Sequence, residues 1–357
     1  KITMIQVNII PYILLFKQPA GTSRGVYTTR KVWYVVLTSQ DKTIQGIGEC
    51  APLPNLSCDD CLDYESILNG ACSKLSETGE IDYDSLRSFP SILFGLESAL
   101  LHYKCGSYSF LNTSFSRGEK GIPINGLIWM GNTESMHKQI ADKLEAGFRC
   151  IKLKIGALNF EEELKVLRSI RSNYSKEELM LRVDANGAFS PGEAMDKLNR
   201  LAELEIHSIE QPIRNGQWDE MAKLASISPV PIALDEELIG VNSLTEKKKL
   251  LTNIKPQYII LKPSLHGGLV GAEEWIKEAT NLNIDWWITS ALESNIGLNV
   301  IAQWTASLGV ESPQGLGTGA LYENNLPMPL EIRGDRLWFN PSGKVLNINK
   351  QLNLSCK

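Results

Sequence analysis

Five strand-like apolar runs in the chain each end in a charged residue, in the order Lys, Asp, Glu, Asp, Lys. The five terminal charges are Lys154, Asp184, Glu210, Asp235 and Lys262. A charge at the end of a buried strand is costly unless it has a task. Because successive charges are separated by about one β/α unit, roughly 25 to 30 residues, the spacing predicts a ring of acids and bases at the mouth of a parallel barrel.

The three middle charges of the ring are carboxylates that end successive strands, so we expect Asp184, Glu210 and Asp235 to converge. Carboxylates held within a few ångström of one another repel, and a divalent cation removes the conflict. Ligands that are all oxygen favour Mg²⁺, with Mn²⁺ as a substitute, over zinc. The alternative is that the acids are separate helix caps or surface ion pairs, which is disfavoured because all three occur in register.

Lysines flank these acids on both sides of the ring. Lys152 and Lys154 are two residues apart on one strand, so their side chains point the same way. Two adjacent ammonium groups lower each other's pKa, and a lysine must lose its proton before it acts as a base at neutral pH. Lys154, at the end of its strand, is the expected base. Lys262 comes from the strand across the ring and would be a second acid/base or a fixed cation; the alternative is that the lysines cap strand ends in solvent.

Further polar residues and glycines follow the same strands and are expected around the pocket. Roles in substrate binding or in support of the metal ligands are expected for Lys152, Asn186, Glu236, Ser290, Gly315 and Gly317, with Gln211 beside Glu210 as another supporting group. The glycines would either leave backbone N–H groups free for an anion or serve a loop that needs positive φ. This set predicts that a metal holds a substrate carboxylate while a base removes the proton from the neighbouring carbon.

A barrel is needed to position these charges. Its first strand is expected at residues 122–130 and its last two strands at residues 285–290 and 314–319, which brings the number of strands to eight. No full amphipathic helix follows the last strand. The predicted fold class is therefore α/β, a modified TIM barrel of (β/α)7β type.

The residues before the barrel have an α+β pattern. Strands are expected at residues 4–16 and 32–37, joined by a polar loop that holds Gly21, Arg24, Gly25 and Arg30. A turn-rich segment spans residues 46–54, and apolar residues at helical spacing mark a helix over residues 91–103. Strands followed by helices indicate a separate layered unit.

These patterns divide the chain into three segments. Residues 1–118 are expected to form an N-terminal α+β capping domain, and residues 119–320 the (β/α)7β barrel that carries the catalytic groups. Residues 321–357 form a C-terminal tail with a strand-like stretch at residues 336–339. We expect this tail to pack back on the capping domain and to complete a lid over the barrel.

Composition excludes several classes of partner. The 357 residues carry a net charge of −5, which provides neither a basic stripe for nucleic acid nor a polybasic patch for a membrane. No stretch reaches the roughly 18 apolar residues of a membrane helix. The expected partner is a small-molecule carboxylate, and the oligomeric state is left open.

The seven cysteines are an odd number and mostly scattered, which is typical of reduced thiols in the cytoplasm. Cys58 and Cys61 form a lone Cys-x-x-Cys pair, but no second such motif supports a metal site there. A cytoplasmic location is therefore expected.

At the ring of charges the sequence resembles the enolase superfamily, in its muconate-lactonising branch. That branch has Lys-x-Lys, Asp-x-Asn, Glu-x-Pro, Asp-Glu and Lys motifs, and this chain has Lys152-Leu153-Lys154, Asp184-Ala185-Asn186, Glu210-Gln211-Pro212, Asp235-Glu236 and Lys262-Pro263. The resemblance implies that the three acids bind Mg²⁺ and that Lys154 is the acid/base.

Within this branch the chain is most similar to the o-succinylbenzoate synthases of menaquinone biosynthesis. Residues 48–54 are similar to the lid loop of that family, and residues 315–319 replace the Asp-x-Asp that dipeptide epimerases have after strand eight. The resemblance implies a carbon–oxygen lyase, a hydro-lyase. The expected reaction is the Mg-dependent syn-dehydration of 2-succinyl-6-hydroxy-2,4-cyclohexadiene-1-carboxylate to 2-succinylbenzoate. Lys262 would then be a cation over the opposite face of the substrate. Ala291 and Asn55 depart from the residues common in this family.

Three alternatives use or break the same ring. An N-succinylamino acid racemase or a dipeptide-type epimerase would use Lys154 and Lys262 as two bases for 1,1-proton transfer. A muconate cycloisomerase is a weaker alternative. A barrel that only binds a metabolite would require a broken ring, whereas all five charges are present.

Overall fold

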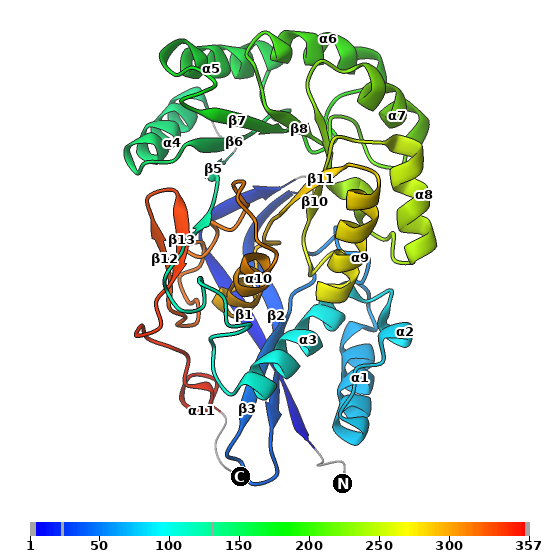
Figure 1. Ribbon diagram of the computed structural model, residues 1–357, viewed down its shortest axis with the longest axis vertical. Helices are drawn as coiled ribbons and strands as arrows, with labels where there is room; N and C mark the ends of the chain where they lie inside the picture. Colours follow the sequence, from blue (N-terminus) through cyan, green and yellow to red (C-terminus); the bar gives the residue numbers. More distant parts are fainter. Residues whose placement is uncertain (1–4, 23–24, 130–131, 354–357) are drawn as a thin grey trace.

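The N-terminal part of the chain is an antiparallel sheet that lies beside a parallel barrel (Figure 1). The computed structural model describes residues 5–22, 25–129 and 132–353. The sheet has the order β1-β2-β3, and its elements and the following helices are β1 (Gln6–Thr22), β2 (Gly25–Thr38), β3 (Gln45–Cys50), α1 (Tyr64–Thr78), α2 (Tyr83–Leu86) and α3 (Pro90–Cys105). The predicted α+β capping domain is thus confirmed.

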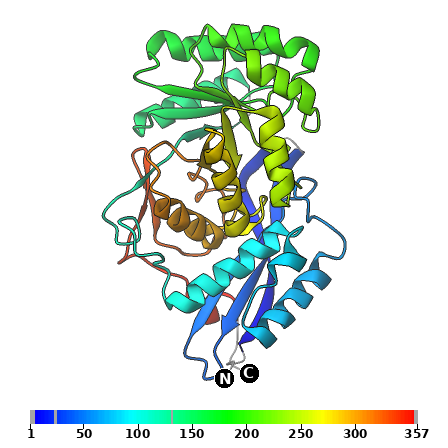
Figure 2. The same ribbon diagram turned by 45° about the vertical axis from the view of Figure 1, so that its right-hand side comes forward.

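The second half of β2, residues 32–38, is buried on both faces, because its side chains alternate between two apolar clusters. Trp33, Val35 and Leu37 pack with residues of α1 and α3, which cover one face of the sheet (Figure 2). Tyr34 and Val36 pack on the opposite face, with residues of the C-terminal tail and of the barrel loops. The capping sheet is therefore the layer between its own helices and the rest of the molecule.

Helix α3 lies directly on β3, and this contact needs glycine. A Cβ atom on Gly48 would lie 1.9 Å from the carbonyl oxygen of Gly95, far inside van der Waals contact. The two glycines let the backbones of helix and strand approach, which holds the segment that follows β3 in place over the barrel.

The polar connection expected between the first two strands is much shorter than predicted. Strands β1 and β2 pair out to Thr22 and Gly25, so Arg30 lies inside β2 and is 2% exposed. The pairing continues past the polar residues because Arg30 finds buried carbonyl acceptors at Ala51 and Ala291. Arg24 lies outside the described residues.

The barrel is a seven-stranded parallel sheet in the order β11-β10-β9-β8-β7-β6-β5. Its strands are β5 (Gly126–Ile128), β6 (Cys150–Lys154), β7 (Met180–Asp184), β8 (Ser208–Glu210), β9 (Ile232–Leu234), β10 (Tyr258–Leu261) and β11 (Asp285–Ile288). The helices between and after them are α4 (Thr133–Glu145), α5 (Phe160–Asn173), α6 (Pro191–Ala202), α7 (Trp218–Ile227), η1 (Glu236–Leu238), α8 (Leu244–Ile254), α9 (Gly268–Asn281) and α10 (Asn295–Ser307). This arrangement confirms the predicted fold class.

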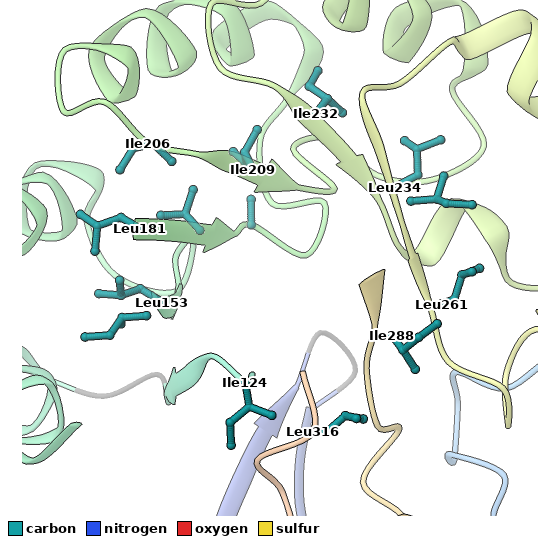
Figure 3. Packing of buried hydrophobic residues seen from close by; sticks show 14 of the residues in the cluster. Ile124, Leu153, Leu181, Ile206, Ile209, Ile232, Leu234, Leu261, Ile288 and Leu316 are labelled. Atoms are coloured by element: carbon teal, nitrogen blue, oxygen red, sulfur yellow. The ribbon is translucent and has the colours of Figure 1, made fainter. Parts of the chain in front are cut away.

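One buried layer joins the strands to the surrounding helices. Alternate strand residues such as Leu153, Ile209 and Leu261 pack in one cluster with helix residues such as Leu167 and Leu198. Figure 3 shows this layer along the strands from Leu153 to Ile288. Because strand side chains alternate, the remaining strand residues, including the charged ones, face the barrel interior.

Two strands differ from the prediction. The expected first strand is split: β4 (Ile122–Pro123) pairs with β13 (Arg336–Phe339) in the tail, and only β5 pairs with β6. Met130, the predicted end of this strand, lies outside the described residues. The expected eighth strand at residues 314–319 is reduced to two bridges, Gln314 to Ile124 and Gly315 to Thr289. Glycine at three of its positions weakens it as a strand. The two bridges nevertheless close the barrel between its first and last strands.

The tail contributes to the same core as the capping sheet. It contains β12 (Leu330–Arg333), β13 (Arg336–Phe339) and α11 (Ile348–Gln351). Tyr322 and Leu326 cluster with Leu14 and Phe16 of β1, and the Phe16 and Tyr322 ring centroids lie 4.5 Å apart. Within the part of the chain that is described, no helix has the length and apolar character required to cross a membrane.

Candidate active site

The five predicted charges meet at one end of the barrel. Residues Lys154, Asp184 and Glu210 are paired in register across β6, β7 and β8, so their side chains start from neighbouring positions. Asp235 and Lys262 directly follow β9 and β10. The structure therefore brings together all five residues of the ring.

Asp184, Glu210 and Asp235, here called the acid triad, form a compact group of carboxylates. Each offers one oxygen atom within 4.8 Å of the others, and all three residues are at most 1% exposed. Glu210 Oε1 and Asp235 Oδ1 are buried without a hydrogen-bond partner among the described residues. Orphaned carboxylate oxygens in an all-oxygen donor set fit a hard divalent cation.

Three lysines reach the acid triad as ion pairs. Lys152 Nζ lies 2.6 Å from Glu210 Oε2 and 3.3 Å from Asp184 Oδ2. Lys154 Nζ lies 2.7 Å from Asp184 Oδ2. Lys262 Nζ contacts Asp235 Oδ2 at 2.6 Å. Lysine ammonium groups therefore contact the triad from β6 on one side and from the end of β10 on the other.

Burial and neighbouring charges shift the titration of these groups in opposite directions. Burial raises the pKa of Glu210, and repulsion from the other two acids adds to this effect against the attraction of Lys152. Burial also acts to raise the pKa of Asp184, but the ammonium groups of Lys154 and Lys152 outweigh it and hold this pKa below its usual range. The triad thus holds carboxylates of unequal basicity.

The expectation that adjacent ammonium groups lower each other's pKa is wrong for Lys152. Burial does act to lower this pKa, but the carboxylates of Glu210 and Asp184 contact the ammonium group and raise the pKa above its ordinary value. Burial likewise acts to lower the pKa of Lys262, but the charges of Asp235 and Glu236 and the hydrogen bond to Asp235 together raise this pKa above its ordinary value. Ion pairing with the acids, rather than repulsion between lysines, controls these two groups.

Asn186 and Glu236 lie beside the acid triad and are hydrogen-bonded to each other. Asn186 has a φ of 44°, and its backbone N–H donates to Asp184 Oδ1 at 3.0 Å. Its side-chain oxygen accepts from Lys154 Nζ at 2.9 Å, and its Nδ2 donates to Glu236 Oε1 at 2.8 Å. Asn186 therefore fixes Asp184, Lys154 and Glu236 relative to one another.

Gln211 joins the end of β8 to the segment that follows β9. It has a φ of 39°, and its Oε1 accepts from the backbone N–H groups of Asp235 and Glu237. Its Nε2 donates to Glu237 Oε2 at 2.9 Å. A left-handed backbone at a non-glycine residue is unfavourable, so strain at Asn186 and Gln211 is stored beside the triad.

The positions expected to bind substrate line one cleft, which encloses about 790 Å³ including its open mouth. Ser290, Gly315 and Gly317 are among its lining residues. The hydroxyl of Ser290 donates to Glu293 Oε2 at 2.6 Å, so its proton is already used within the protein. A Cβ atom on Gly315 would lie 2.5 Å from Thr289 Oγ1. Any larger residue at this position would therefore clash with Thr289.

Sequence reasoning missed the apolar walls of the cleft. They include Leu53, Leu56, Leu127, Trp129 and Leu292. A leucine that lines a cleft has the same appearance in a sequence as one in a core, so no signal distinguished them. The walls place apolar surface opposite the charged ring, as is usual for a site that binds a small molecule.

His266 was also missed as a supporting residue. The backbone N–H of Lys262 donates to His266 Nδ1 at 2.9 Å. Burial lowers the pKa of His266 to about 3, so the ring stays neutral and Nδ1 remains an acceptor. His266 thereby fixes the backbone from which Lys262 extends.

The site closes on an apolar floor inside the barrel. Ala233, Ile260 and Trp287 form a buried cluster there, and the guanidinium carbon of Arg182 lies 4.0 Å from the Trp287 ring centroid. Five residues of the ring and its surroundings, Lys152, Lys154, Asp235, Glu236 and Lys262, line the cleft, where a ligand would enter.

Comparisons with known proteins agree with this geometry. Residues 135–340 match the family described as "Enolase C-terminal domain-like", and residues 4–103 match the family described as "MenC, N-terminal domain". An o-succinylbenzoate synthase of Desulfotalea psychrophila is 45% identical over 91% of this chain and 96% of its own length.

Solved structures show the same fold. The crystal structure of MenC from Desulfotalea psychrophila has a TM-score of 0.80 and 41% identity, and the match covers 94% of this chain and 99% of that one. The L-Ala-D/L-Glu epimerase from Bacillus subtilis has a TM-score of 0.81 at 19% identity, with 97% and 98% of the chains covered, and this likeness concerns the fold alone. The chain belongs to the enolase superfamily and, within it, to the MenC family of proteins related to o-succinylbenzoate synthase.

Proposed function

We propose that the protein catalyses the dehydration of 2-succinyl-6-hydroxy-2,4-cyclohexadiene-1-carboxylate to 2-succinylbenzoate in menaquinone biosynthesis. The observation that carries the proposal is the 45% identity to an o-succinylbenzoate synthase over nearly the whole of both chains. The complete ring of acids and lysines at the end of the barrel supports it, because the reaction needs both a cation site and a base.

The acid triad would hold Mg²⁺, with Mn²⁺ as a substitute, through its oxygen atoms. The bound cation would supply positive charge to the substrate carboxylate while the neighbouring carbon loses its proton. Glu236 and Asn186 lie beside the triad and would fix its orientation, since they are hydrogen-bonded to each other and Asn186 also contacts Asp184.

Lys154 would act as the base and then as the acid. It would take the proton from C1, next to the carboxylate, and hand that proton to the hydroxyl leaving C6 on the same face. The C1–H and C6–O bonds break, a C1=C6 double bond forms and one water leaves, so the lysine ends in the protonation state in which it began. Lys262 would stay charged over the opposite face, consistent with a pKa that Asp235 raises.

Two further assignments belong to the same proposal. The division into residues 1–118, 119–320 and 321–357 would correspond to a capping domain, a catalytic barrel and a tail that completes the cap. A cytoplasmic location fits the cysteines of the described part of the chain, which are free thiols, as is usual in a reducing compartment.

The direct test is to incubate the protein with Mg²⁺ and the cyclohexadiene substrate and to follow the absorbance of the aromatic product. We expect product formation that stops on addition of a chelator and resumes with excess Mg²⁺. In a matched measurement, the protein is incubated with N-succinyl amino acids in deuterated water, and exchange of their α-proton is followed. Exchange of their α-proton without any turnover of the cyclohexadiene would reject the proposal in favour of an N-succinylamino acid racemase.

A further inference from the structure

Two walls of the cleft come from segments that are distant in the sequence. The lid loop (residues 48–54) begins with the last three residues of β3 in the capping domain and continues beyond the strand, and the loop of residues 289–294 follows β11 of the barrel. Leu53 from the first loop and Ala291 and Leu292 from the second line the cleft together. The shape of this side of the cleft therefore depends on how the two loops are held relative to each other.

Arg30 connects these loops from a position behind them. It extends from β2, and its two terminal nitrogens donate to the carbonyl oxygens of Ala51 and Ala291. The side chain is 2% exposed and is not part of the cleft lining. A guanidinium is planar and has donors in a fixed fork, so it can set the spacing of two acceptors in a way that a flexible ammonium group cannot.

The barrel loop is strained at the point where Arg30 holds it. Leu292 has a φ of 61°, a left-handed conformation that is unfavourable for leucine and persists only where the surroundings fix it. The carbonyl of Leu292 accepts from the Tyr322 hydroxyl at 2.6 Å. The backbone N–H of Ala291 donates to Glu293 Oε2 at 2.8 Å, and its carbonyl accepts from Arg30. The backbone groups of Ala291 and Leu292 named here are thus each hydrogen-bonded to a side chain.

A buried guanidinium is a costly way to fill this space. Arg30 Nε has no hydrogen-bond partner among the described residues, and an apolar side chain of similar volume would avoid the desolvation penalty. The buried carboxylates of Glu49 and Glu293 lie in the same region, since Arg30 and both acids act on the pKa of Tyr322. What the guanidinium provides, and an apolar residue would not, is the pair of hydrogen bonds to the two loops.

We propose that Arg30 is a positioning residue that fixes the wall formed by Ala291 and Leu292 against the lid loop. It thereby sets how tightly the cleft binds the part of the substrate remote from the acid triad. It would act on binding rather than on proton transfer, because Lys154 and the triad belong to other strands. The inference rests on the proposed dehydration for the identity of the substrate, but not for the effect on the loops.

The test compares Arg30→Met and Arg30→Lys with the control Arg87→Met. Arg87 also joins the capping domain to the barrel, since it donates to the carbonyl of Asn242 and to Glu274, but it does not contact the cleft loops. For Arg30→Met we expect KM for the cyclohexadiene substrate to rise about tenfold, as is reasonable when hydrogen bonds from a charged donor are lost, with kcat changed less than about threefold. Arg30→Lys should give a smaller rise, and Arg87→Met none.

Amide hydrogen exchange supplies a readout that needs no substrate. In both Arg30 variants we expect faster exchange at Ala51, at Leu53 and at residues 289–294, with unchanged protection in β6 to β10 as evidence that the barrel is folded; Pro52 and Pro54 carry no amide hydrogen. Equal exchange in those loops for wild type and Arg30→Met would overturn the inference, as would a KM no higher than that of Arg87→Met. If the wild type lacks turnover, the proposed function fails, and the exchange measurement alone decides for or against the role of Arg30.

Discussion

Lys154 Nζ lies 2.7 Å from Asp184 Oδ2, and the two residues are direct register partners on β6 and β7. The same carboxylate oxygen also lies 3.3 Å from Lys152 Nζ. Strand pairing therefore places the proposed base beside the first acid of the triad, and Asn186 is hydrogen-bonded to both side chains. Because the geometry is set by the barrel backbone, single changes at these side chains should alter the chemistry without disturbing the fold.

Replacing Lys154 by alanine should abolish turnover. Its side chain is the proposed carrier of the proton from C1 to the leaving hydroxyl, and the loss of a general base costs roughly 10²- to 10⁴-fold in rate. We expect kcat to fall by about 10³-fold or more, while far-ultraviolet circular dichroism and Mg²⁺ affinity stay close to those of the wild type. Near-normal turnover by Lys154→Ala would rule out Lys154 as the base.

Substituting arginine for Lys154 or for Lys262 should show which lysine acts as a base and which acts only as a fixed cation. Arginine keeps the positive charge but does not give up its proton in proteins. Lys262→Arg should therefore retain measurable dehydration, within about 10²-fold of the wild type, while Lys262→Met falls further. Lys154→Arg should be as inactive as Lys154→Ala. If Lys262→Arg is as inactive as Lys154→Arg, both lysines transfer protons, and the two-base chemistry of a racemase is favoured instead.

Replacing Asp184 by asparagine should weaken metal binding directly. The substitution keeps the shape of the side chain but removes one negative charge from the acid triad, whose oxygens lie within 4.8 Å of one another. Since even supporting residues of metal sites change affinity by roughly 10- to 100-fold, we expect Mg²⁺ affinity measured by titration calorimetry to fall by more than about 100-fold.

The matched control for the metal titration is Asp142→Asn. Asp142 is an exposed acid of α4 that pairs only with Lys138 at 2.9 Å among the described residues. Its replacement changes the net charge by the same amount as Asp184→Asn but should leave Mg²⁺ affinity unchanged. Equal effects of the two substitutions would mean that the titration reports overall charge rather than the triad.

Much of the barrel could be predicted from the sequence because its strands carry two signals at once. In β6, β7 and β8 the apolar residues face the helices and the charged residues face the interior, so Lys154, Asp184 and Glu210 mark both the strand ends and the site. Local pattern and function coincide there. The eighth strand lacked such a pattern, because closure depends on bridges made by Gln314 and Gly315 with residues far away in the chain.

The parts that were not predicted depend on contacts between the capping domain and the barrel. Arg30 was predicted to lie in a loop. Its acceptors, the carbonyls of Ala51 and Ala291, are backbone groups that no sequence pattern identifies. The direction of the Lys152 pKa shift was missed for a similar reason. The proximity of Lys152 to its own neighbour Lys154 is visible in the sequence, whereas its 2.6 Å contact with Glu210 is visible only in the fold.

Asp59 gives a prediction about stability and pH that does not involve the cleft. Its side chain is 1% exposed, and its Oδ2 accepts from the backbone N–H and the hydroxyl of Ser91, at 2.9 and 2.6 Å, near the start of α3. Burial raises the pKa of Asp59 from 3.8 to about 6. The folded protein therefore binds this proton more tightly than the unfolded chain does, so stability falls as pH rises from about 4 to about 6 and stays lower above that range.

Asp59→Asn should remove this cost. The amide oxygen can accept the two hydrogen bonds from Ser91, and the amide nitrogen takes the place of Oδ1, which has no partner among the described residues. From the size of the pKa shift we expect the variant to be more stable than the wild type by about 3 kcal/mol at pH 7.5 in urea unfolding, with the difference shrinking as the pH falls from about 6 to about 4. Asp63→Asn, at an exposed acid that makes no cap hydrogen bond, should show no such change. If the advantage of Asp59→Asn instead grew as the pH fell, the Asp59 carboxylate would be stabilised by the fold rather than penalised by its burial.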